Sequence, residues 1–306
     1  MKLLLAQPRG FCAGVVRAIQ IVERALELWG APIYVKHEIV HNRHVVDRLK
    51  KMGAIFIEDV NDVPEGERLI YSAHGVSPAV REAARKRNLI EIDATCGLVT
   101  KVHSAAKRFA QKGRHIILIG HKNHVETIGT AGEAPEQTTI VECAEDVYKL
   151  PFTQEDALFY LTQTTLSLDD VEGIVTSLKE RYPQIETLPS SSICYATTNR
   201  QMALRSIADH TDLVLVVGDP TSSNSNRLCE VAKMRNVPAH LINQREDIDP
   251  KWLKGVKTIG LTAGASTPED IVQSCIDELK VLGVNEVEDV IYKEEDVVFQ
   301  LPSSLK

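Results

Sequence analysis

The amino-acid sequence predicts an α/β fold made of three similar small domains with largely parallel sheets. Short runs of Val, Ile and Leu alternate with helical patterns from Lys2 to about Gly283, as is typical of β–α units. Three cysteines, Cys12, Cys96 and Cys194, recur in one context, a short loop that opens an amphipathic helix. Polar loops after later strands also recur at matched distances from these cysteines. Together these observations indicate three equivalent modules that share one centre.

Short apolar runs mark the expected strands. They lie at residues 3–6, 33–35, 69–72, 116–119, 157–161, 213–217 and 258–261. Runs of this length, rich in β-branched residues and separated by helical patterns, are typical of buried parallel strands.

Helix signals stand between these runs. After Cys12, apolar residues recur three or four positions apart, at Val15, Val16, Ile19, Val22 and Leu26. Ser77 and Thr267 each precede a proline that suits the first turn of a helix. Ser167 with Asp170 resembles a capping box in which Asp replaces Glu.

The spacing of polar residues after each cysteine predicts where the modules end. His41, His124 and Ser222 follow their module's cysteine by 28 or 29 positions, and Ser223 and Asn224 lie beside Ser222. His74, Thr164 and Ser266 follow by 62 to 72 positions, so the period is roughly 90 residues, the size of a small domain. We therefore predict domains at 1–95, 96–192 and 193–285. Residues 286–306 would form a charged tail with one possible strand at 297–301.

These loops are expected to meet in one pocket. In open α/β sheets, ligands bind beyond the carboxyl ends of the strands, which is where each loop would lie. Three copies around a pseudo-threefold axis would make the pocket central. Histidine, hydroxyl and amide groups beside helix N-termini suit a phosphate or diphosphate group. Each histidine alone could equally be a packed or surface residue, and the recurrence at similar offsets favours the pocket.

Composition restricts the partners and the compartment. The formal net charge of −7 argues against nucleic acid as the main partner. No apolar stretch approaches the roughly 20 residues that span a bilayer, and the run in MKLLLAQPRG is too short for a signal peptide. We expect a cytoplasmic protein without a membrane partner. Six cysteines in a reducing compartment point to metal binding or catalysis instead of disulfides.

Three helix-start thiols could hold a metal centre without saturating it. The helix dipole and unpaired N–H groups favour the thiolate, the metal-binding form. A [4Fe–4S] cluster held by three cysteines leaves one iron free for an oxygen ligand. The alternative is that these cysteines are inert small hydrophobic residues, as we expect for Cys143 in its strand-like run and for Cys229 and Cys275 in helical patterns.

Glu126 provides a carboxylate in these loops. Near a bound anion and away from water, its pKa should be raised, which suits a proton donor. It could also be a first-turn glutamate stabilised by the helix dipole. In HKNHVE, His121 and His124 could share a helix face and bind zinc, although a third ligand is unassigned.

Several long motifs occur in a fixed order along the chain. They are PRGFCAGVVRAI, HEIVHNRHVV, SAHGVS, DATCGLVTKVH, LTQTTLS, ICYATTNRQ, SSNSNRL and TAGAS. On these motifs the chain resembles, nearly end to end, the LytB/IspH-type family of 4-hydroxy-3-methylbut-2-enyl diphosphate reductases. The resemblance implies a trefoil of three α/β domains around a central [4Fe–4S] cluster bound by Cys12, Cys96 and Cys194.

The resemblance also implies the roles of the loop residues. The diphosphate would be bound by His41, His74, His124, Ser222, Ser223, Asn224 and Ser266. Thr164 would lie near the substrate hydroxyl, and Glu126 would deliver a proton through it. The products would be isopentenyl and dimethylallyl diphosphate, the end of the non-mevalonate isoprenoid pathway, with two electrons supplied by ferredoxin or flavodoxin.

Two other functions would use the same residues. A zinc-dependent hydrolase would use the cysteines and histidines without redox chemistry. A phosphate-metabolite binding protein would use the loops without any cluster.

Overall fold

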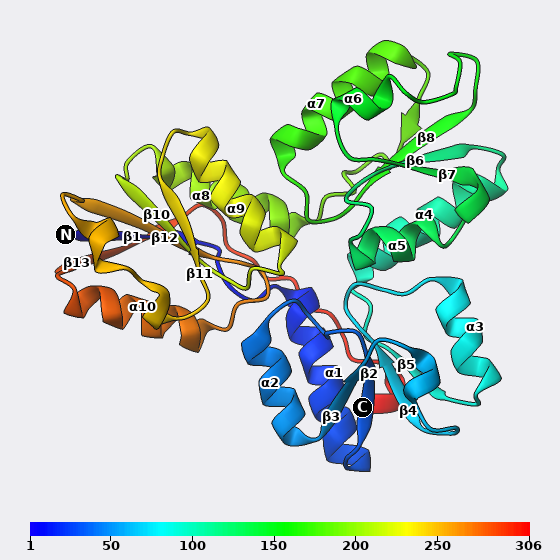
Figure 1. Ribbon diagram of the computed structural model, residues 1–306, viewed down its shortest axis with the longest axis horizontal. Coiled ribbons are helices and arrows are strands. Elements are labelled where there is room, and N and C mark those ends of the chain that lie inside the picture. Colours follow the sequence, from blue (N-terminus) through cyan, green and yellow to red (C-terminus); the bar gives the residue numbers. More distant parts are fainter. The chain divides into compact units, whose positions relative to one another are not determined.

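The computed structural model describes residues 1–306 and contains three parallel β-sheets with helices beside them (Figure 1). The strands are β1 (Lys2–Gln7), β2 (Ile33–Lys36), β3 (Ala54–Ile57), β4 (Arg68–Tyr71), β5 (Ile90–Asp93), β6 (His115–Ile119), β7 (Thr138–Val141), β8 (Leu158–Thr162), β9 (Glu186–Thr187), β10 (Leu213–Val217), β11 (Ala239–Ile242), β12 (Thr258–Ala263) and β13 (Glu286–Ile291). The sheet orders are β11-β10-β12-β1-β13, β3-β2-β4-β5 and β7-β6-β8-β9. Every strand pair is parallel, which confirms the predicted α/β class.

Ten α-helices connect these strands. They are α1 (Ala13–Trp29), α2 (Arg43–Met52), α3 (Pro78–Lys86), α4 (Gly97–Gln111), α5 (Val125–Ala131), α6 (Ala144–Val147), α7 (Leu168–Arg181), α8 (Tyr195–Ala208), α9 (Ser223–Met234) and α10 (Glu269–Val281). The helices α1, α4 and α8 begin directly after Cys12, Cys96 and Cys194. The predicted helix-start position of the three cysteines is therefore confirmed.

The chain folds into two compact units. The first unit contains the five-stranded sheet and consists of Met1–Val16, His41–Asp47 and Tyr195–Val298. The second unit contains both four-stranded sheets and consists of Arg17–Val40, Arg48–Cys194 and Phe299–Lys306.

The five-stranded sheet is covered on both faces, as Figure 1 shows for α10 on one side and for α8 and α9 on the other. Alternate strand residues explain this, because successive side chains point to opposite faces. Leu3 and Leu5 pack with the α10 residues Val272 and Ile276. Leu4, between them, packs instead with residues of α8 and α9. The near-continuous apolar runs in the sequence follow from this burial on both faces.

Successive side chains also point to opposite faces in the sheet that contains β6 and β8. Ile117 packs with α7 residues, whereas its neighbour Ile116 packs with residues of α4. The helices therefore lie against both faces of this sheet as well. The loops at the carboxyl ends of the strands remain the place where polar residues can gather.

The first and the last strand of the chain pair with each other in the five-stranded sheet. The strand β1 lies between β12 and β13, so Lys2 pairs with Thr258 on one side and with Glu286 on the other. The predicted strand at 297–301 is wrong, because residues 292–302 contain no regular element and the added strand is β13. The strand β13 begins directly after Asn285, whose N–H donates to Met1 O at 3.0 Å and so starts the pairing with β1.

Two of the three predicted helix caps are confirmed. Ser77 is the N-cap of α3, and Ser167 caps α7 by accepting the N–H of Asp170 at 3.4 Å. The helix α10 begins one residue later than predicted, with Pro268 at the N-cap, because the Thr267 hydroxyl donates to Val217 O instead. None of the helices combines the length and apolarity needed to cross a lipid bilayer.

Candidate active site

Each of the three helix-start cysteines is held by a hydrogen bond from its backbone N–H to a loop that carries a predicted pocket residue. Cys12 donates to Ala265 O at 3.1 Å, directly before Ser266. Cys96 donates to Ala73 O at 3.0 Å, directly before His74. Cys194 donates to Thr164 O at 3.1 Å. Each cysteine is thus joined to the second polar loop of another predicted module, and this regular pattern supports the equivalence of the three sequences.

The environments of the six cysteines differ in their chemistry. Cys12, Cys96 and Cys194 are half-buried. Burial raises the pKa of the Cys229 and Cys275 thiols to about 12, so both stay protonated in the core. These two residues are the structural cysteines that the sequence predicts.

Cys143 does not lie in a strand, contrary to the prediction. It follows β7 and is the exposed N-cap residue of the short helix α6. A hydrogen bond with the Glu145 side chain raises the pKa of the Cys143 thiol, so the acidic first turn opposes thiolate formation there. A helix start is therefore not sufficient for metal binding. The three recurring cysteines differ from Cys143 in that they are half-buried.

In the first unit, the structure brings Ser222, Asn224, His41 and Ser266 into one hydrogen-bond network. Asn224 Oδ1 accepts the Ala265 N–H at 2.8 Å. The carbonyl group of the same Ala265 accepts the Cys12 N–H. The Ser266 hydroxyl donates to His41 O at 2.9 Å. Ser222 caps α9, and Ser223 is the first residue of this helix. The predicted residues of this unit thus gather at the carboxyl ends of β10 and β12.

Tyr195 links the start of α8 to the Cys12 loop. Burial raises its pKa to about 12, and the nearby Cys12 and Glu295 add to the shift. Tyr195 directly follows Cys194 in the chain. Its phenol is protonated at neutral pH and can serve as a hydrogen-bond donor.

Two glycines allow the start of α9 to approach the sheet. A Cβ atom at Gly218, after β10, or at Gly264, after β12, would overlap the hydroxyl of Ser225. Ser225 is fully buried, and its N–H donates to Ser222 Oγ at 3.3 Å. The missing side chains therefore let α9 present Ser222, Ser223 and Asn224 close to the strand ends.

The variant Gly218→Ala is expected to lower the free energy of unfolding by about 1–3 kcal/mol, because the new methyl group overpacks the buried Ser225. Thermal unfolding of the purified protein measures this change, and adding Ser225→Gly should restore part of the loss. Gly173→Ala is the control, because Gly173 lies exposed in α7 and a methyl group there would meet no atom within 4 Å. Equal unfolding midpoints for Gly218→Ala and Gly173→Ala would contradict the packing argument.

In the second unit, a buried carboxylate contacts the threonine predicted to lie near the substrate. Glu126 Oε1 accepts the Thr164 backbone N–H at 2.5 Å, and Oε2 accepts the Thr164 hydroxyl at 3.0 Å. Both side chains are buried. His124 is the N-cap of α5, and its Nδ1 accepts the Glu126 N–H at 3.2 Å. A neutral His124 ring therefore carries its proton on Nε2.

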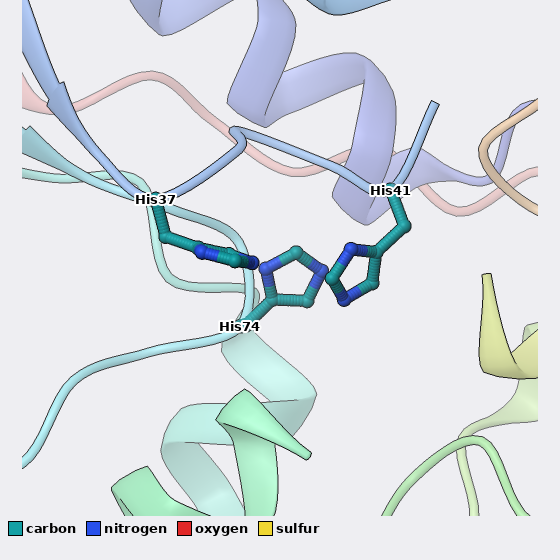
Figure 2. A group of neighbouring side chains, drawn as sticks. All are labelled: His37, His41 and His74. Atoms are coloured by element: carbon teal, nitrogen blue, oxygen red, sulfur yellow. The ribbon is translucent and has the colours of Figure 1, made fainter. Parts of the chain in front are cut away.

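The histidines of this unit form a contiguous group. The rings of His74 and His124 meet edge to face with centroids 6.3 Å apart, and His74 Nδ1 lies 3.2 Å from Ser72 Oγ. Figure 2 shows His37 and His74 turned toward each other from the loops that follow β2 and β4, with ring centroids 5.9 Å apart. His37 was not identified from the sequence. It lies in the left-handed region at φ 61°, which no spacing pattern indicates.

Two further buried residues support these loops. Gln163 Oε1 accepts hydrogen bonds from the His121 N–H at 3.1 Å and the Thr127 hydroxyl at 3.2 Å. The His103 ring, hydrogen-bonded to Glu133 at 3.0 Å, packs so closely that a Cβ atom at Gly75 or Gly129 would lie only 3.0 to 3.3 Å from it. Gln163 could have been found from the LTQTTLS motif, which includes it. The contact of His103 with both glycines has no sequence signal.

The prediction that His121 and His124 share a helix face and could bind zinc there is wrong. His121 and His124 precede α5, which begins at Val125, so they do not share a helix face. His124 Nδ1 is occupied by the Glu126 N–H, and both oxygens of Glu126 accept hydrogen bonds from Thr164. These atoms are arranged for hydrogen bonding to one another.

The fold and the site define a class of α/β protein with half-buried thiols and polar side chains in the loops after parallel strands, and with a buried carboxylate–hydroxyl pair. The chain belongs to the LytB protein family, whose sequence profile matches residues 3–280.

Known proteins of high similarity share one name. The chain is 72% identical over 305 residues to a protein of Protochlamydia amoebophila named 4-hydroxy-3-methylbut-2-enyl diphosphate reductase, with 100% of this chain and 97% of the relative covered. A protein of the same name from Chlamydia pneumoniae is 65% identical, with 100% and 99% covered.

Two solved structures are also similar. The E-1-hydroxy-2-methyl-but-2-enyl-4-diphosphate reductase from Plasmodium falciparum has a TM-score of 0.97 at 52% identity, with 100% of this chain and 96% of that chain covered. A structure of (E)-4-hydroxy-3-methyl-but-2-enyl diphosphate reductase, described as the terminal enzyme of the non-mevalonate pathway, has a TM-score of 0.65 at 31% identity, with 92% and 99% covered.

Proposed function

We propose that this chain is an iron–sulfur reductase that converts (E)-4-hydroxy-3-methylbut-2-enyl diphosphate to isopentenyl and dimethylallyl diphosphate. The observation that carries the proposal is the repeated anchoring of Cys12, Cys96 and Cys194, each on a loop with a polar pocket residue. The names of the similar proteins agree with it. The reaction consumes two electrons and two protons, breaks the C–O bond of the allylic alcohol and releases water.

The diphosphate is proposed to bind to the loops by their hydrogen-bond donors. The proposed ligands are His41, His74, His124, Ser222, Ser223, Asn224 and Ser266. Hydroxyl, amide and imidazole N–H groups suit diphosphate oxygens, and Ser222 and Ser223 lie at the N-terminus of α9, where the helix dipole favours an anion. His124 contributes a donor at Nε2 because its Nδ1 is already an acceptor.

The cofactor is proposed to be a [4Fe–4S] cluster held by the three cysteines. The fit rests on three half-buried thiols at helix N-termini, where the thiolate is favoured, whereas the other three cysteines are protonated or lie beside acidic groups. When bound, such a cluster would supply electrons and, at the iron that no cysteine ligates, a Lewis acid for the substrate hydroxyl.

Glu126 and Thr164 are proposed to supply the proton that leaves with the hydroxyl group as water. Glu126 Oε1 is kept as an acceptor by the Thr164 backbone N–H, so a proton on the carboxyl group belongs on Oε2. That oxygen is 3.0 Å from Thr164 Oγ1, close enough to pass its proton to the hydroxyl group. The Thr164 hydroxyl can then donate its own proton to the substrate. The second proton forms a new C–H bond on the allyl group after it has gained two electrons, which gives either product.

Electrons are proposed to come from ferredoxin or flavodoxin in the cytoplasm. The support for this electron donor is the membership of the chain in its family. A hydrolase is disfavoured because Glu126, the carboxylate that could activate a water molecule in these loops, is committed to Thr164 by both of its oxygens.

Anaerobic purification followed by metal analysis and turnover tests the proposal. We expect a brown protein with about four irons and matching sulfide per chain, and with conversion of the diphosphate substrate when a chemical reductant is supplied. The matched control omits the reductant and should give no product. A colourless protein that contains zinc or no metal after this preparation would overturn the proposed function.

A further inference from the structure

One buried cation lies beside the Cys12 loop and belongs to neither the proposed substrate site nor the proton path. Arg200 of α8 has 0% of its surface exposed and is the largest fully buried side chain of the chain. Its Nε and Nη2 both donate to Gly10 O, at 3.0 and 2.7 Å, and Nη2 also lies 3.3 Å from Phe11 O. These two carbonyls immediately precede Cys12.

The same guanidinium also binds the first turn of α8. Its Nη1 donates to Ala196 O at 3.0 Å, two residues after Cys194. Arg200 therefore joins the backbone before one proposed cluster ligand to the helix turn after another. Its planar, rigid fork of N–H donors can reach these carbonyls together, which a lysine cannot do.

The charge of Arg200 is balanced by the C-terminal segment. Glu295 lies after β13, in a stretch without regular secondary structure, and both of its carboxylate oxygens are 3.3 Å from Arg200 Nη1. Its Oε1 also accepts the Asn199 amide at 2.8 Å, and its side chain is only 14% exposed. Without Glu295, the buried guanidinium would keep its backbone bonds but lose its counter-charge, which is strongly unfavourable.

Further contacts hold the same Cys12 loop. Gly10 lies at φ 66°, and its N–H donates to Ala263 O at 3.2 Å. Before this loop, Arg9 pairs with Glu269 at 2.7 Å and with Asp289 at 3.2 Å. Arg200 completes the support by donating to the loop carbonyls of Gly10 and Phe11.

We propose that Arg200 and Glu295 are positioning residues that fix the Cys12 backbone for metal binding, so that the segment after β13 is part of the metal-binding apparatus. The inference rests on the proposed role of Cys12 as a cluster ligand. It assigns a function to Glu295, which lies in the segment that the sequence presents only as a charged tail.

Glu295→Gln is the principal test, because it removes the counter-charge and keeps the size of the side chain. Glu294→Gln is the matched control, since Glu294 is the exposed neighbour in the same segment. Hydrogen exchange on the metal-free proteins measures opening at the amides of Gly10 and Cys12. We expect exchange there to be roughly tenfold faster in Glu295→Gln than in the parent or in Glu294→Gln.

Iron release from the anaerobically loaded proteins, measured with a chelator, is the second readout. Glu295→Gln should lose iron several-fold faster at a temperature where its circular dichroism is unchanged, and Glu295→Asp should restore part of the retention. Exchange and iron release equal to those of the parent would overturn the proposal. Faster exchange spread evenly over β1, β10 and β12 would also overturn it, because the role would then be general stability.

The two readouts separate this inference from the proposed function. If the parent protein binds no iron, the proposed function fails, and local exchange in Glu295→Gln still decides whether Arg200 and Glu295 position the Cys12 loop.

Discussion

Replacing Cys194 by serine is expected to remove most of the bound iron and nearly all turnover. A serine hydroxyl at the start of α8 is a poor substitute for a thiolate as an iron ligand, and two cysteines would remain to hold the cluster. The chain should still fold, because the Cys194 side chain is only half-buried and its backbone bond to Thr164 O does not depend on sulfur. Iron and sulfide analysis after anaerobic purification, with circular dichroism on the same samples, measures both effects.

Cys143→Ser is the matched control, since Cys143 also lies at the start of a helix and is exposed. It should retain the iron content and turnover of the parent. Cys229→Ser should retain both as well, with a lower unfolding midpoint because a hydroxyl group is buried in the core of the five-stranded sheet. Equal iron loss at Cys143, Cys194 and Cys229 would refute the assignment of distinct roles to these cysteines.

Replacing Glu126 by glutamine is expected to lower kcat by about 10²–10⁴, with iron content and KM close to those of the parent. The glutamine oxygen can still accept the Thr164 N–H, and its amide group can still contact the Thr164 hydroxyl. The variant therefore keeps the local geometry and removes the transferable proton. Steady-state kinetics with an artificial electron donor, together with a metal count, test the prediction.

Glu172→Gln on the exposed surface of α7 makes the same chemical change away from the site and should have parent-like kinetics. Thr164→Val should reproduce the loss in kcat, because it removes the hydroxyl group that we propose passes the proton from Glu126 to the substrate. A near-normal kcat for Glu126→Gln would exclude this carboxyl group as the proton donor.

Local signals in the sequence were sufficient to predict the α/β class, seven of the strands (β1, β2, β4, β6, β8, β10 and β12) and the helix starts after the three cysteines. These features depend on neighbours in the chain, such as the apolar run of β10 or the position of Cys96 before α4. The spacing of apolar residues placed Val16 on the buried face of α1, but Val16 is exposed. The buried face contains Val15 and Ile19 instead, so residue spacing alone does not identify every buried position.

Features that depend on long-range contacts could not be predicted. The pairing of β1 with β13 and the burial of Arg200 against Glu295 join residues that are far apart in the chain. The packing of the His103 ring over Gly75 likewise requires the fold to be known. Within the candidate site, the recurrence of polar loops indicated the main residues, whereas His37 has no counterpart at a matched offset.

The position of β1 between β12 and β13 has a consequence for protein synthesis. This strand leaves the ribosome first, yet both of its partners, β12 and β13, are among the last segments to be made. At roughly 5–20 residues per second, β1 waits on the order of tens of seconds before it can pair. The Cys12 N–H finds Ala265 O only after that delay. If Cys12 ligates the proposed cluster, its hydrogen-bonded setting is complete only after residue 265 has been made, so metal insertion there would follow the synthesis of the last strands.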